Sequence, residues 1–320
     1  MVSQSELVNL EDLVTIDHPY RLYKKLLDTS LIAEQLADIG SLSGPKGFSP
    51  ERLFLCLLLQ FMEDVSDREA ERFIRENTAA RWFCGFSLLD NTPDHSVFCR
   101  SRKRIGTERL SSLFAAIRDQ LQQQGYMNEV FTFVDATHLI AKSNLWKERD
   151  KALKAKYDKL NNEVLPKVST DKQARIGCKG KSKYWYGYKQ QTSVDMQSGL
   201  INKVAVAPAN ETDAQGLRRV CPSQGAVYAD KGYCTGPAKK AAARKAVHLA
   251  AIKKNNMKGK NKDLDRWYCG IRSPYERVFS KLNHRVRYRG IAKNQFAAFM
   301  QSIGFNLKRL RVLQMEQALA

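Results

Sequence analysis

The hydrophobic pattern of the chain changes its period near residue 130, and this change divides the 320-residue sequence into two kinds of structure. Before that point, apolar residues recur at helical spacing. After it, short apolar runs that fit strands alternate with helical segments. With 43% hydrophobic and 27% charged residues, a chain of this size can form one large globular domain or two. We therefore expect a helical first part followed by a mixed α/β part.

Charge follows the same division. Residues 1 to 130 carry 15 basic and 19 acidic side chains, so their net charge is −4. Of the 53 basic and 33 acidic residues in the chain, 38 and 14 lie after residue 130 and give that part a net charge of +24. A surface of this sign attracts polyanions and releases their counterions, which favours nucleic acid over a small acidic substrate or a membrane surface as the partner.

Several classes of protein are disfavoured by what the sequence lacks. The seven cysteines are an odd number without a Cys-x-x-Cys pair, which argues against a zinc site or a disulfide framework. There is no His-Glu-x-x-His pair and no Gly-x-Ser-x-Gly elbow, and Arg175 stands where an ATP-binding loop needs its first glycine. Apolar runs are too short for a bilayer and residues 1 to 30 lack a signal-peptide pattern, so we expect an intracellular protein without membrane contact.

The first part carries start signals for three helices, which follow a mixed segment that ends near residue 43. Ser49 marks the first start, a second helix is expected over residues 67 to 76, and Asp94 opens the third. The third helix carries a basic cluster made of Arg100, Arg102, Lys103 and Arg104. Compact helices that end in a basic one fit a helix-turn-helix variant, but a helical bundle with a solvated charged face fits equally well.

After residue 130 the sequence alternates between strand and helix signals. A buried strand over residues 130 to 134 ends in Asp135, and a short strand over residues 226 to 229 ends in Asp230. The other signals are a hairpin over 184 to 206, helices over 212 to 220 and 237 to 246, and a strand over 247 to 252. A lysine-rich insertion, residues 142 to 183, interrupts this order.

Three carboxylates stand out in this basic part of the chain: Asp135, Asp230 and Glu276. The two aspartates follow strands, where side chains project from a sheet edge into a shared site, although Asp is also common at the start of turns. The run from Ser273 to Glu276 fits a helix cap, and from spacing alone that interpretation of Glu276 is favoured over a catalytic one. Few acids in a basic field suggest a metal held against phosphate.

A series of blocks lies in one order along residues 44 to 312. They are Gly47-Phe48-Ser49-Pro50, Val65-Ser66-Asp67-Arg68-Glu69, Pro93-Asp94-His95-Ser96, Asp135-Ala136-Thr137, the stretch from Lys179 to Lys189, Val194-Asp195, Ser198-Gly199-Leu200-Ile201, Ala207-Pro208-Ala209-Asn210 with Asp213, Tyr228-Ala229-Asp230-Lys231-Gly232-Tyr233, Tyr275-Glu276-Arg277, Arg287-Tyr288-Arg289-Gly290 and Asn306-Leu307-Lys308-Arg309-Leu310. Each block alone is weak, but together they resemble the bacterial insertion-sequence DDE transposases, and most nearly the insertion-sequence-five group.

The resemblance implies an α/β catalytic domain with an RNase H-like mixed sheet flanked by helices, preceded by an all-α DNA-binding domain. It implies that Asp135, Asp230 and Glu276 are the catalytic triad and the ligands of Mg²⁺ or Mn²⁺, with two ions expected. The family places its Glu four residues after an Arg, as Arg272 stands before Glu276. At two auxiliary positions the chain departs from the family, with Cys269 in place of Tyr and Asn283 in place of Lys.

The expected function is that of a DNA transposase, which binds the ends of an insertion sequence, hydrolyses them and joins the 3′-hydroxyl ends to target DNA. Double-stranded DNA is the expected partner, a homodimer or larger complex would hold two ends, and the expected location is the bacterial cytoplasm on the nucleoid. Besides the four basic residues of the third helix, the residues expected to bind DNA are Lys231, Arg272, Lys281, Arg285, Arg287, Arg289 and Lys293. A non-catalytic DNA-binding regulator and a general RNase H-like nuclease are the alternatives.

The expected domains are an N-terminal arm over residues 1–45, suited to oligomerisation, a helical DNA-binding domain over 46–128, and the catalytic domain over 129–315. The aromatic residues between 184 and 188 offer surfaces on which unpaired bases can stack. Their alternating pattern nevertheless favours packing within the sheet.

Overall fold

The computed structural model describes residues 8–40, 47–180, 182–280 and 285–319, except for the side chains of residues 276–280 and 319. The chain divides into two compact units, residues 1–119 with 300–320 and residues 120–299. The divisions fall inside two helices, α7 (His95–Gln123) and α13 (Ile291–Leu319). None of the helices in the described part of the chain has both the length and the apolar character needed to cross a bilayer.

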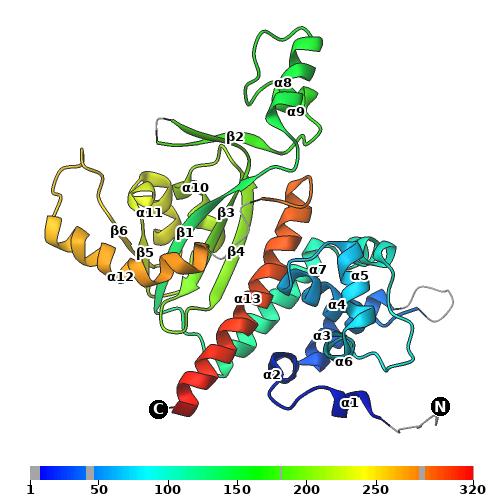
Figure 1. Ribbon diagram of the computed structural model, residues 1–320. Coiled ribbons are helices and arrows are strands. Elements are labelled where there is room, and N and C mark those ends of the chain that lie inside the picture. Colours follow the sequence, from blue (N-terminus) through cyan, green and yellow to red (C-terminus); the bar gives the residue numbers. More distant parts are fainter. Residues whose placement is uncertain (1–7, 41–46, 181, 281–284, 320) are drawn as a thin grey trace. The chain divides into compact units, whose positions relative to one another are not determined.

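The first unit is helical (Figure 1). It contains α1 (Leu10–Leu13), α2 (Pro19–Leu26), α3 (Thr29–Gln35), the 3₁₀ turn η1 (Ala37–Ile39), α4 (Pro50–Met62), α5 (Asp67–Glu76), α6 (Thr78–Phe83), the first part of α7 and the last part of α13. The three predicted helix starts are confirmed. Ser49 caps α4 by accepting a hydrogen bond from the Arg52 N–H at 3.3 Å, and Asp94 accepts one from the Ser96 N–H at 2.7 Å. Sequence patterns do not predict α1 to α3, which are too short for a periodic signal.

Helix α4 forms the centre of the first unit, since residues 54–62 are all buried. A helix that is apolar on every side is one that is packed on every side. The last part of α13 packs against its end. A side chain at Gly304 would place its first carbon 2.8 Å from Met62 Cγ, and Lys308 Nζ donates to the Met62 carbonyl at 2.6 Å. Gly106 interrupts α7 with a φ of 70°, and the helix resumes directly after it.

The second unit is built on a six-stranded mixed sheet. Its strands are β1 (Phe131–Ile140), β2 (Arg175–Lys179), β3 (Lys183–Asp195), β4 (Ile201–Pro208), β5 (Ala226–Ala229) and β6 (His248–Ala251). Strand β1 is central because it pairs antiparallel with β3 on one side and parallel with β5 on the other. Strand β3 also pairs antiparallel with β2 and β4, and β6 extends the parallel half. This is the RNase H-like mixed sheet that the sequence predicts.

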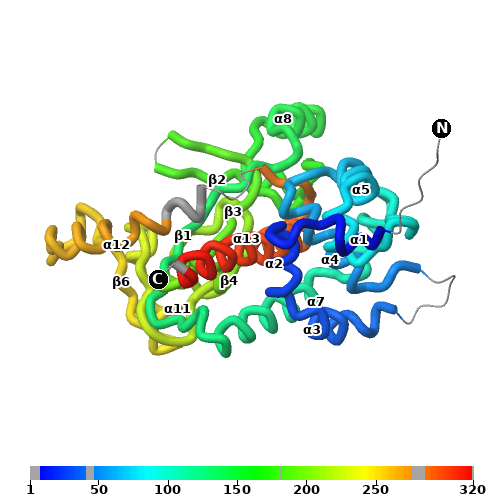
Figure 2. The backbone as a smooth tube through the Cα atoms, turned by 60° about the horizontal axis from the view of Figure 1, so that its bottom comes forward, coloured from blue at the N-terminus to red at the C-terminus, as the bar shows by residue number. Residues whose placement is uncertain are grey.

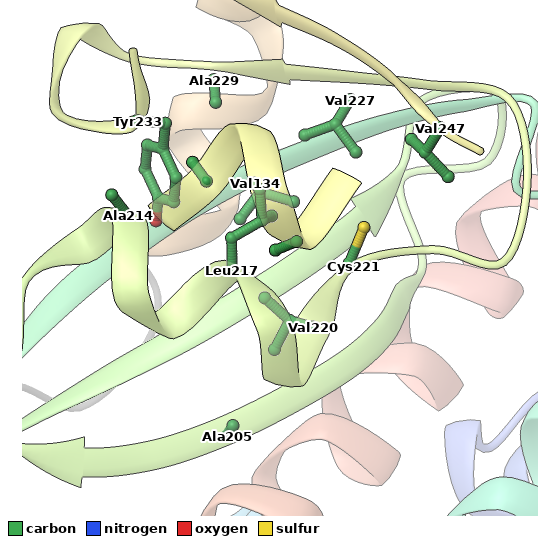
Figure 3. Close-up of a cluster of buried hydrophobic side chains, with 12 residues drawn as sticks. Val134, Ala205, Ala214, Leu217, Val220, Cys221, Val227, Ala229, Tyr233 and Val247 are labelled. Atoms are coloured by element: carbon green, nitrogen blue, oxygen red, sulfur yellow. The ribbon is translucent and has the colours of Figure 1, made fainter. Parts of the chain in front are cut away.

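Helices cover both faces of this sheet. On one face, α10 (Asp213–Val220) and α11 (Gly236–Ala243) enclose a buried apolar cluster that Val134 enters from β1 (Figure 3). Successive side chains of a strand point to opposite faces, so Phe133 lies on the other face. There its ring is 6.2 Å from that of Tyr275 in α12 (Lys262–Ser280). The first turns of α13 contact the sheet through Gln295, which hydrogen bonds to the backbone of β4.

The lysine-rich insertion contains regular structure that its composition does not predict. It forms α8 (Leu145–Lys154), α9 (Leu165–Val168) and β2. Glu148 and Ala152, one helical turn apart, are the buried residues of α8. The Glu148 carboxylate accepts hydrogen bonds from the Thr170 N–H and from Lys151 Nζ, both at 3.0 Å. A short apolar face among many lysines gives too weak a periodicity to identify a helix.

Asp135 lies within a strand, so the prediction that a strand ends at this residue is wrong. Strand β1 continues to Ile140 because β3 pairs with it as far as the Ile140–Gly187 pair. Only the parallel partner ends at this level, since the last pair between β1 and β5 is Val134–Ala229. The local sequence indicates the buried run, whereas the length of the strand is set by β3, which is distant in sequence.

Candidate active site

Asp135 and Asp230 lie next to each other where β5 leaves the sheet. Because Val134 pairs with Ala229 in parallel register, the following residues, Asp135 and Asp230, occupy neighbouring positions. After Ala229 the chain turns into the 3₁₀ helix η2 (Lys231–Tyr233), for which Asp230 is the N-terminal flanking residue. The sheet thus brings together two of the three carboxylates that the sequence singles out.

The Asp135 carboxyl group is half-buried, and its surroundings act on its pKa in both directions. Burial raises the pKa of Asp135 to about 6, against the lowering effects of the Ala136 N–H, which donates at 2.8 Å, and of the Arg272 and Lys179 charges. The Asp213 carboxylate adds a raising effect on the same pKa. Placing a cation beside Asp135 would therefore relieve an unfavourable negative charge.

Arg272 connects α12 to this site. Its side chain is buried, with the residue 6% exposed, and its Nη1 lies 3.5 Å from Asp230 Oδ1. The guanidinium also sits over the Phe133 ring, 5.2 Å from the centroid. Arg272 thus contacts both the Asp230 carboxylate and the Phe133 ring. These contacts make it a positioning group that orients Asp230 from the side of α12.

The predicted helix cap at Ser273 is wrong. Helix α12 runs without a break from Lys262 to Ser280, so Ser273 and Glu276 lie inside it and Pro274 is an interior proline. Residues four apart share a face of a helix, which places position 276 one turn beyond Arg272 on the face that contacts Asp230. The Glu276 side chain is outside the described part of the chain.

Asp213 is a further carboxylate at this site. The sequence places it at the start of a helix and in the block that begins at Ala207, without a predicted role in the site. It follows the capping residue Thr212 of α10, and its Oδ1 accepts from Lys189 Nζ at 2.8 Å. A side chain at Gly232 would place its first carbon 3.2 Å from Asp213 Oδ2, so η2 passes close to it. The signal that could have revealed its role is its place in the block that begins at Ala207.

Tyr233 forms the buried floor of the site. It is 0% exposed, and its hydroxyl donates to Gln191 Oε1 at 3.2 Å. Burial and the nearby carboxylates of Asp135, Asp213 and Asp230 raise the pKa of Tyr233 well above its ordinary value. The tyrosine is therefore a neutral hydrogen-bonding group that packs the chain immediately after Asp230 against β3.

The basic residues predicted to bind DNA in the first unit differ in how they are engaged. Arg102 forms a two-pronged ion pair with Asp67, at 2.9 and 2.5 Å. Arg104 donates to the Ile39 carbonyl at 2.9 Å. Arg100, Lys103 and Arg104 are exposed, and Arg100 donates to Ser96 Oγ at 3.0 Å. Three of these four side chains are thus exposed, whereas the half-buried Arg102 is held by its ion pair within the unit.

In the second unit, the predicted DNA-binding residues fall on two segments besides Arg272. Lys231 is exposed in η2, directly after Asp230. The segment over residues 285–293 joins the end of β1, because the Val286 N–H donates to the Ile140 carbonyl at 3.0 Å. Along this segment Arg285, Arg289 and Lys293 are exposed and Arg287 is half-buried. Lys281 lies outside the described residues.

The donor set at the site fits a divalent metal ion. Asp135 and Asp230 offer hard carboxylate oxygens from neighbouring positions, which suits Mg²⁺ or Mn²⁺. Among the described side chains there is no group of three His, Cys, Asp or Glu arranged to hold an ion. The third carboxylate that such a site needs would come from position 276 of α12. This position lies one helical turn beyond Arg272, on the face of α12 that contacts Asp230.

An RNase H-like sheet with paired carboxylates beside its central strand defines the structural class of this chain. A family model described as "Transposase DDE domain" matches residues 127–307, and one described as "Transposase domain (DUF772)" matches residues 8–104. The chain therefore belongs to the transposase DDE-domain family, as the resemblance indicated. Neither model specifies a group within the insertion sequences, so membership of the insertion-sequence-five group stays a prediction.

Two further comparisons add little. No curated protein matches the chain. Among solved structures, a cryo-EM structure of a piggyBac transposase synaptic complex with hairpin DNA is similar at 9% identity, over 97% of this chain and 79% of that chain. Its TM-score is 0.39, and a similarity of that size supports no conclusion about this chain.

Proposed function

We propose that this chain is a DNA transposase that binds the ends of an insertion sequence, hydrolyses a phosphodiester bond there and joins the 3′-hydroxyl ends to target DNA. Asp135, Asp230 and Glu276 are the acidic triad in this proposal. The observation that carries it is the Val134–Ala229 pairing, which makes Asp135 and Asp230 neighbours in a chain of the DDE-domain family. Without that register, the two aspartates would be unrelated residues in a basic surface.

The three carboxylates would hold Mg²⁺ or Mn²⁺, because these hard divalent ions prefer oxygen ligands. When bound, two such ions supply the Lewis acidity that activates a nucleophilic oxygen and stabilises the leaving oxygen of a phosphodiester. The protein's own part is to place the ligands. The Ala136 N–H holds one oxygen of Asp135, and Arg272 holds Asp230 from the side of α12.

Binding of double-stranded DNA falls to the exposed basic side chains around the site. Lys231 follows Asp230 directly, the segment over residues 285–293 bonds to the end of β1, and both carry exposed positive charge. Phosphate contacts of this kind fix the register of DNA on a protein. Water is the nucleophile for cleavage and a 3′-hydroxyl is the nucleophile for joining. A homodimer or larger complex would hold the two ends of the element together.

The test is cleavage of a duplex that carries the end of the element flanking the reading frame. Asp135→Asn and Asp230→Asn should each lower the rate of Mg²⁺- or Mn²⁺-dependent cleavage by roughly 10³-fold or more, because each removes a metal ligand. Binding of the same duplex should stay near that of the unchanged protein. Asp263→Asn is the matched control, since this α12 carboxylate has an 89% exposed side chain.

Three results would contradict the proposal. Unchanged cleavage by both aspartate variants would exclude the triad. Cleavage of an RNA–DNA hybrid in preference to the element end would identify a general nuclease, and DNA binding without any nicking would identify a regulator.

A further inference from the structure

Strands β2 and β3 extend beyond the rest of the sheet as a two-stranded arm, residues 175–187 (Figures 1 and 2). Within it, Arg175 pairs with Gly187 and Lys179 pairs with Lys183. The pairing of β3 with β1 stops at Gly187, and its pairing with β4 begins only at Tyr188. Residues 183–186 of β3 therefore have β2 as their strand partner in the described chain, and the arm stands apart from the sheet.

The base of the arm is held rigidly by two glycines. A side chain at Gly187, whose φ is +152°, would place its first carbon 2.1 Å from the Leu139 carbonyl oxygen. A side chain at Gly177 would meet the Ala209 carbonyl oxygen at 2.5 Å and the Trp185 ring at 2.6 Å. Only glycine allows these approaches, so the arm leaves the sheet in a direction that its base determines.

The outer end of the arm carries positive charge without compensation. Lys179 and Lys183 face each other across the two strands, both are exposed, and neither has an ion-pair partner among the described residues. Like charges that are directly opposite in a hairpin destabilise it. Tyr184, beside them, is 66% exposed, although its neighbours Tyr186 and Tyr188 are buried as their alternating pattern predicted. The outer end of the arm therefore carries exposed charge that lowers the stability of the hairpin and that can bind an anion.

The arm begins near the candidate active site. Gly187 at its base pairs with Ile140 of β1, five residues after Asp135 on the same strand. Arg272 is buried within the protein, whereas Lys179 is exposed. A phosphate that approaches Asp135 would therefore meet a cation from the arm that is available for binding.

We propose that the arm is a clamp for the DNA backbone, in which Lys179 and Lys183 bind phosphates next to the bond that is cleaved and Tyr184 packs against the same strand. The proposal rests on the function proposed above and adds a substrate-binding element to it. The occupant is the phosphodiester backbone of double-stranded DNA, because paired lysines and an exposed aromatic ring match a polyanion with apolar sugar and base edges.

The first test measures how the affinity for element-end DNA depends on salt. The double variant Lys179→Ala/Lys183→Ala should lower the slope of log affinity against log salt by roughly 1 to 2, since each phosphate contact contributes about 0.9. The matched control is Lys239→Ala/Lys240→Ala, which removes two exposed lysines from α11 of the same unit. The charge-retaining variant Lys179→Arg/Lys183→Arg should restore the slope, which separates charge from folding.

Equal losses of slope in the arm variant and in the α11 control would overturn the proposal. So would an arm variant that changes the oligomeric state of the protein and leaves DNA affinity unchanged, because the arm would then bind protein.

The second test locates the arm on DNA through Cys178, which is exposed at the outer end of β2 and pairs with Tyr184. Duplexes that carry a tether ending in a disulfide with a small thiol, at single backbone positions, should exchange with Cys178 only within a few nucleotides of the cleaved bond; the exchange joins Cys178 to the tether and releases the small thiol. Cys178→Ser should abolish that product, while the exposed Cys99 and Cys269 remain as internal controls.

The two proposals fail in different ways. If the unchanged protein cleaves the duplex but the tether on the DNA reacts only with cysteines other than Cys178, the clamp is excluded and the transposase function stands. If Asp135→Asn cleaves normally, the proposed triad fails whatever the position of the arm.

Discussion

In the helical unit two arginines of the basic cluster are engaged within the unit, whereas several exposed cations of the second unit have no ion-pair partner among the described residues. In the first unit, Arg102 is paired with Asp67 and Arg104 with the Ile39 carbonyl. In the second unit the exposed cations without an ion-pair partner among the described residues include Lys179, Lys183, Lys231, Arg289 and Lys293. A run of positive charge in a sequence can therefore consist of cations that pair within the fold or of exposed cations that are available to a ligand. The partners of each side chain distinguish the two cases.

The difference teaches that pairing, rather than position in the sequence, decides what a cation does. A cation paired with a buried or half-buried carboxylate stabilises the fold, and an unpaired one attracts polyanions. Variants of paired residues should thus change the free energy of unfolding, and variants of unpaired residues should change DNA affinity.

The largest expected effect concerns Glu129, a paired carboxylate in the second unit that is 4% exposed. Burial alone would raise its pKa, but hydrogen bonds from Asn202, the Ser223 N–H and Lys203 lower the pKa of Glu129 to about 2. Glu129→Gln should lower the free energy of unfolding at pH 7 by about 3 kcal/mol, the equivalent of the difference between that pKa and the ordinary value near 4.5.

The pH dependence follows from the direction of this shift. Because the pKa is lower in the folded state, the stabilisation is present above about pH 4.5 and is lost as the pH falls towards 2. Urea unfolding between pH 7 and pH 3 should show the difference between Glu129→Gln and the unchanged protein shrinking with acid. Glu163→Gln, at an exposed carboxylate of the same unit, is the control. A difference that is constant with pH would contradict this account of Glu129.

The next effect tests the paired arginine of the first unit. Arg102→Ala should lower the free energy of unfolding by about 2 kcal/mol, because it removes the two-pronged, charged hydrogen bonds to the Asp67 carboxylate. Lys103→Ala, at the adjacent exposed position, should change it by less than about 0.5 kcal/mol. Thermal or urea unfolding of the two variants measures the contrast. If Arg102→Ala weakened DNA binding without changing stability, Arg102 would belong with the unpaired cations.

A smaller effect links Asp171 to the basic segment over residues 285–293. The Tyr188 hydroxyl donates to Asp171 Oδ2 at 2.6 Å and accepts from the Gly290 N–H at 3.0 Å, immediately before α13. Tyr188→Phe should cost about 1.5 kcal/mol of stability and also weaken DNA binding, because the segment over 285–293 loses an anchor. Tyr184→Phe, at an exposed position, is the control for stability. Normal DNA affinity in Tyr188→Phe would show that the segment is placed without this anchor.

The smallest effect on stability is expected for an unpaired cation. Lys293→Ala should change the free energy of unfolding by less than about 0.5 kcal/mol and lower the salt slope of DNA binding by roughly 1. Titrations of element-end DNA at several salt concentrations measure this, with Lys239→Ala on α11 as the control. A loss of stability without a change in slope would place Lys293 among the paired, structural cations.

Local chemistry allowed much of the fold to be predicted. The starts of α4 and α10 and the position of β5 follow from capping residues and from short apolar runs, and all are present. The strand containing Asp135 was predicted to end too early, because its extension to Ile140 depends on pairing with β3. Helices α8 and α9 were missed because their few buried residues are surrounded by lysines.

The candidate site was predicted only in part, and for the same reason. Asp230 follows a strand that local sequence identifies, whereas the cap signature at Ser273 misled because it cannot reveal that α12 already runs from Lys262. The position of Asp213 beside Gly232 depends on contacts between α10 and η2, which no local pattern contains. Pairing across the sheet and between helices decides which acids meet.

The central claim is that Asp135, Asp230 and Glu276 form one metal site, and anomalous scattering from crystals soaked in Mn²⁺ tests it most directly. We expect an anomalous peak between the Asp135 and Asp230 carboxylates, with a Glu276 oxygen in the same coordination shell, and loss of that peak in Asp135→Asn crystals. Mn²⁺ bound elsewhere in a protein that still cleaves element-end DNA, or a Glu276 side chain directed away from the two aspartates, would contradict it.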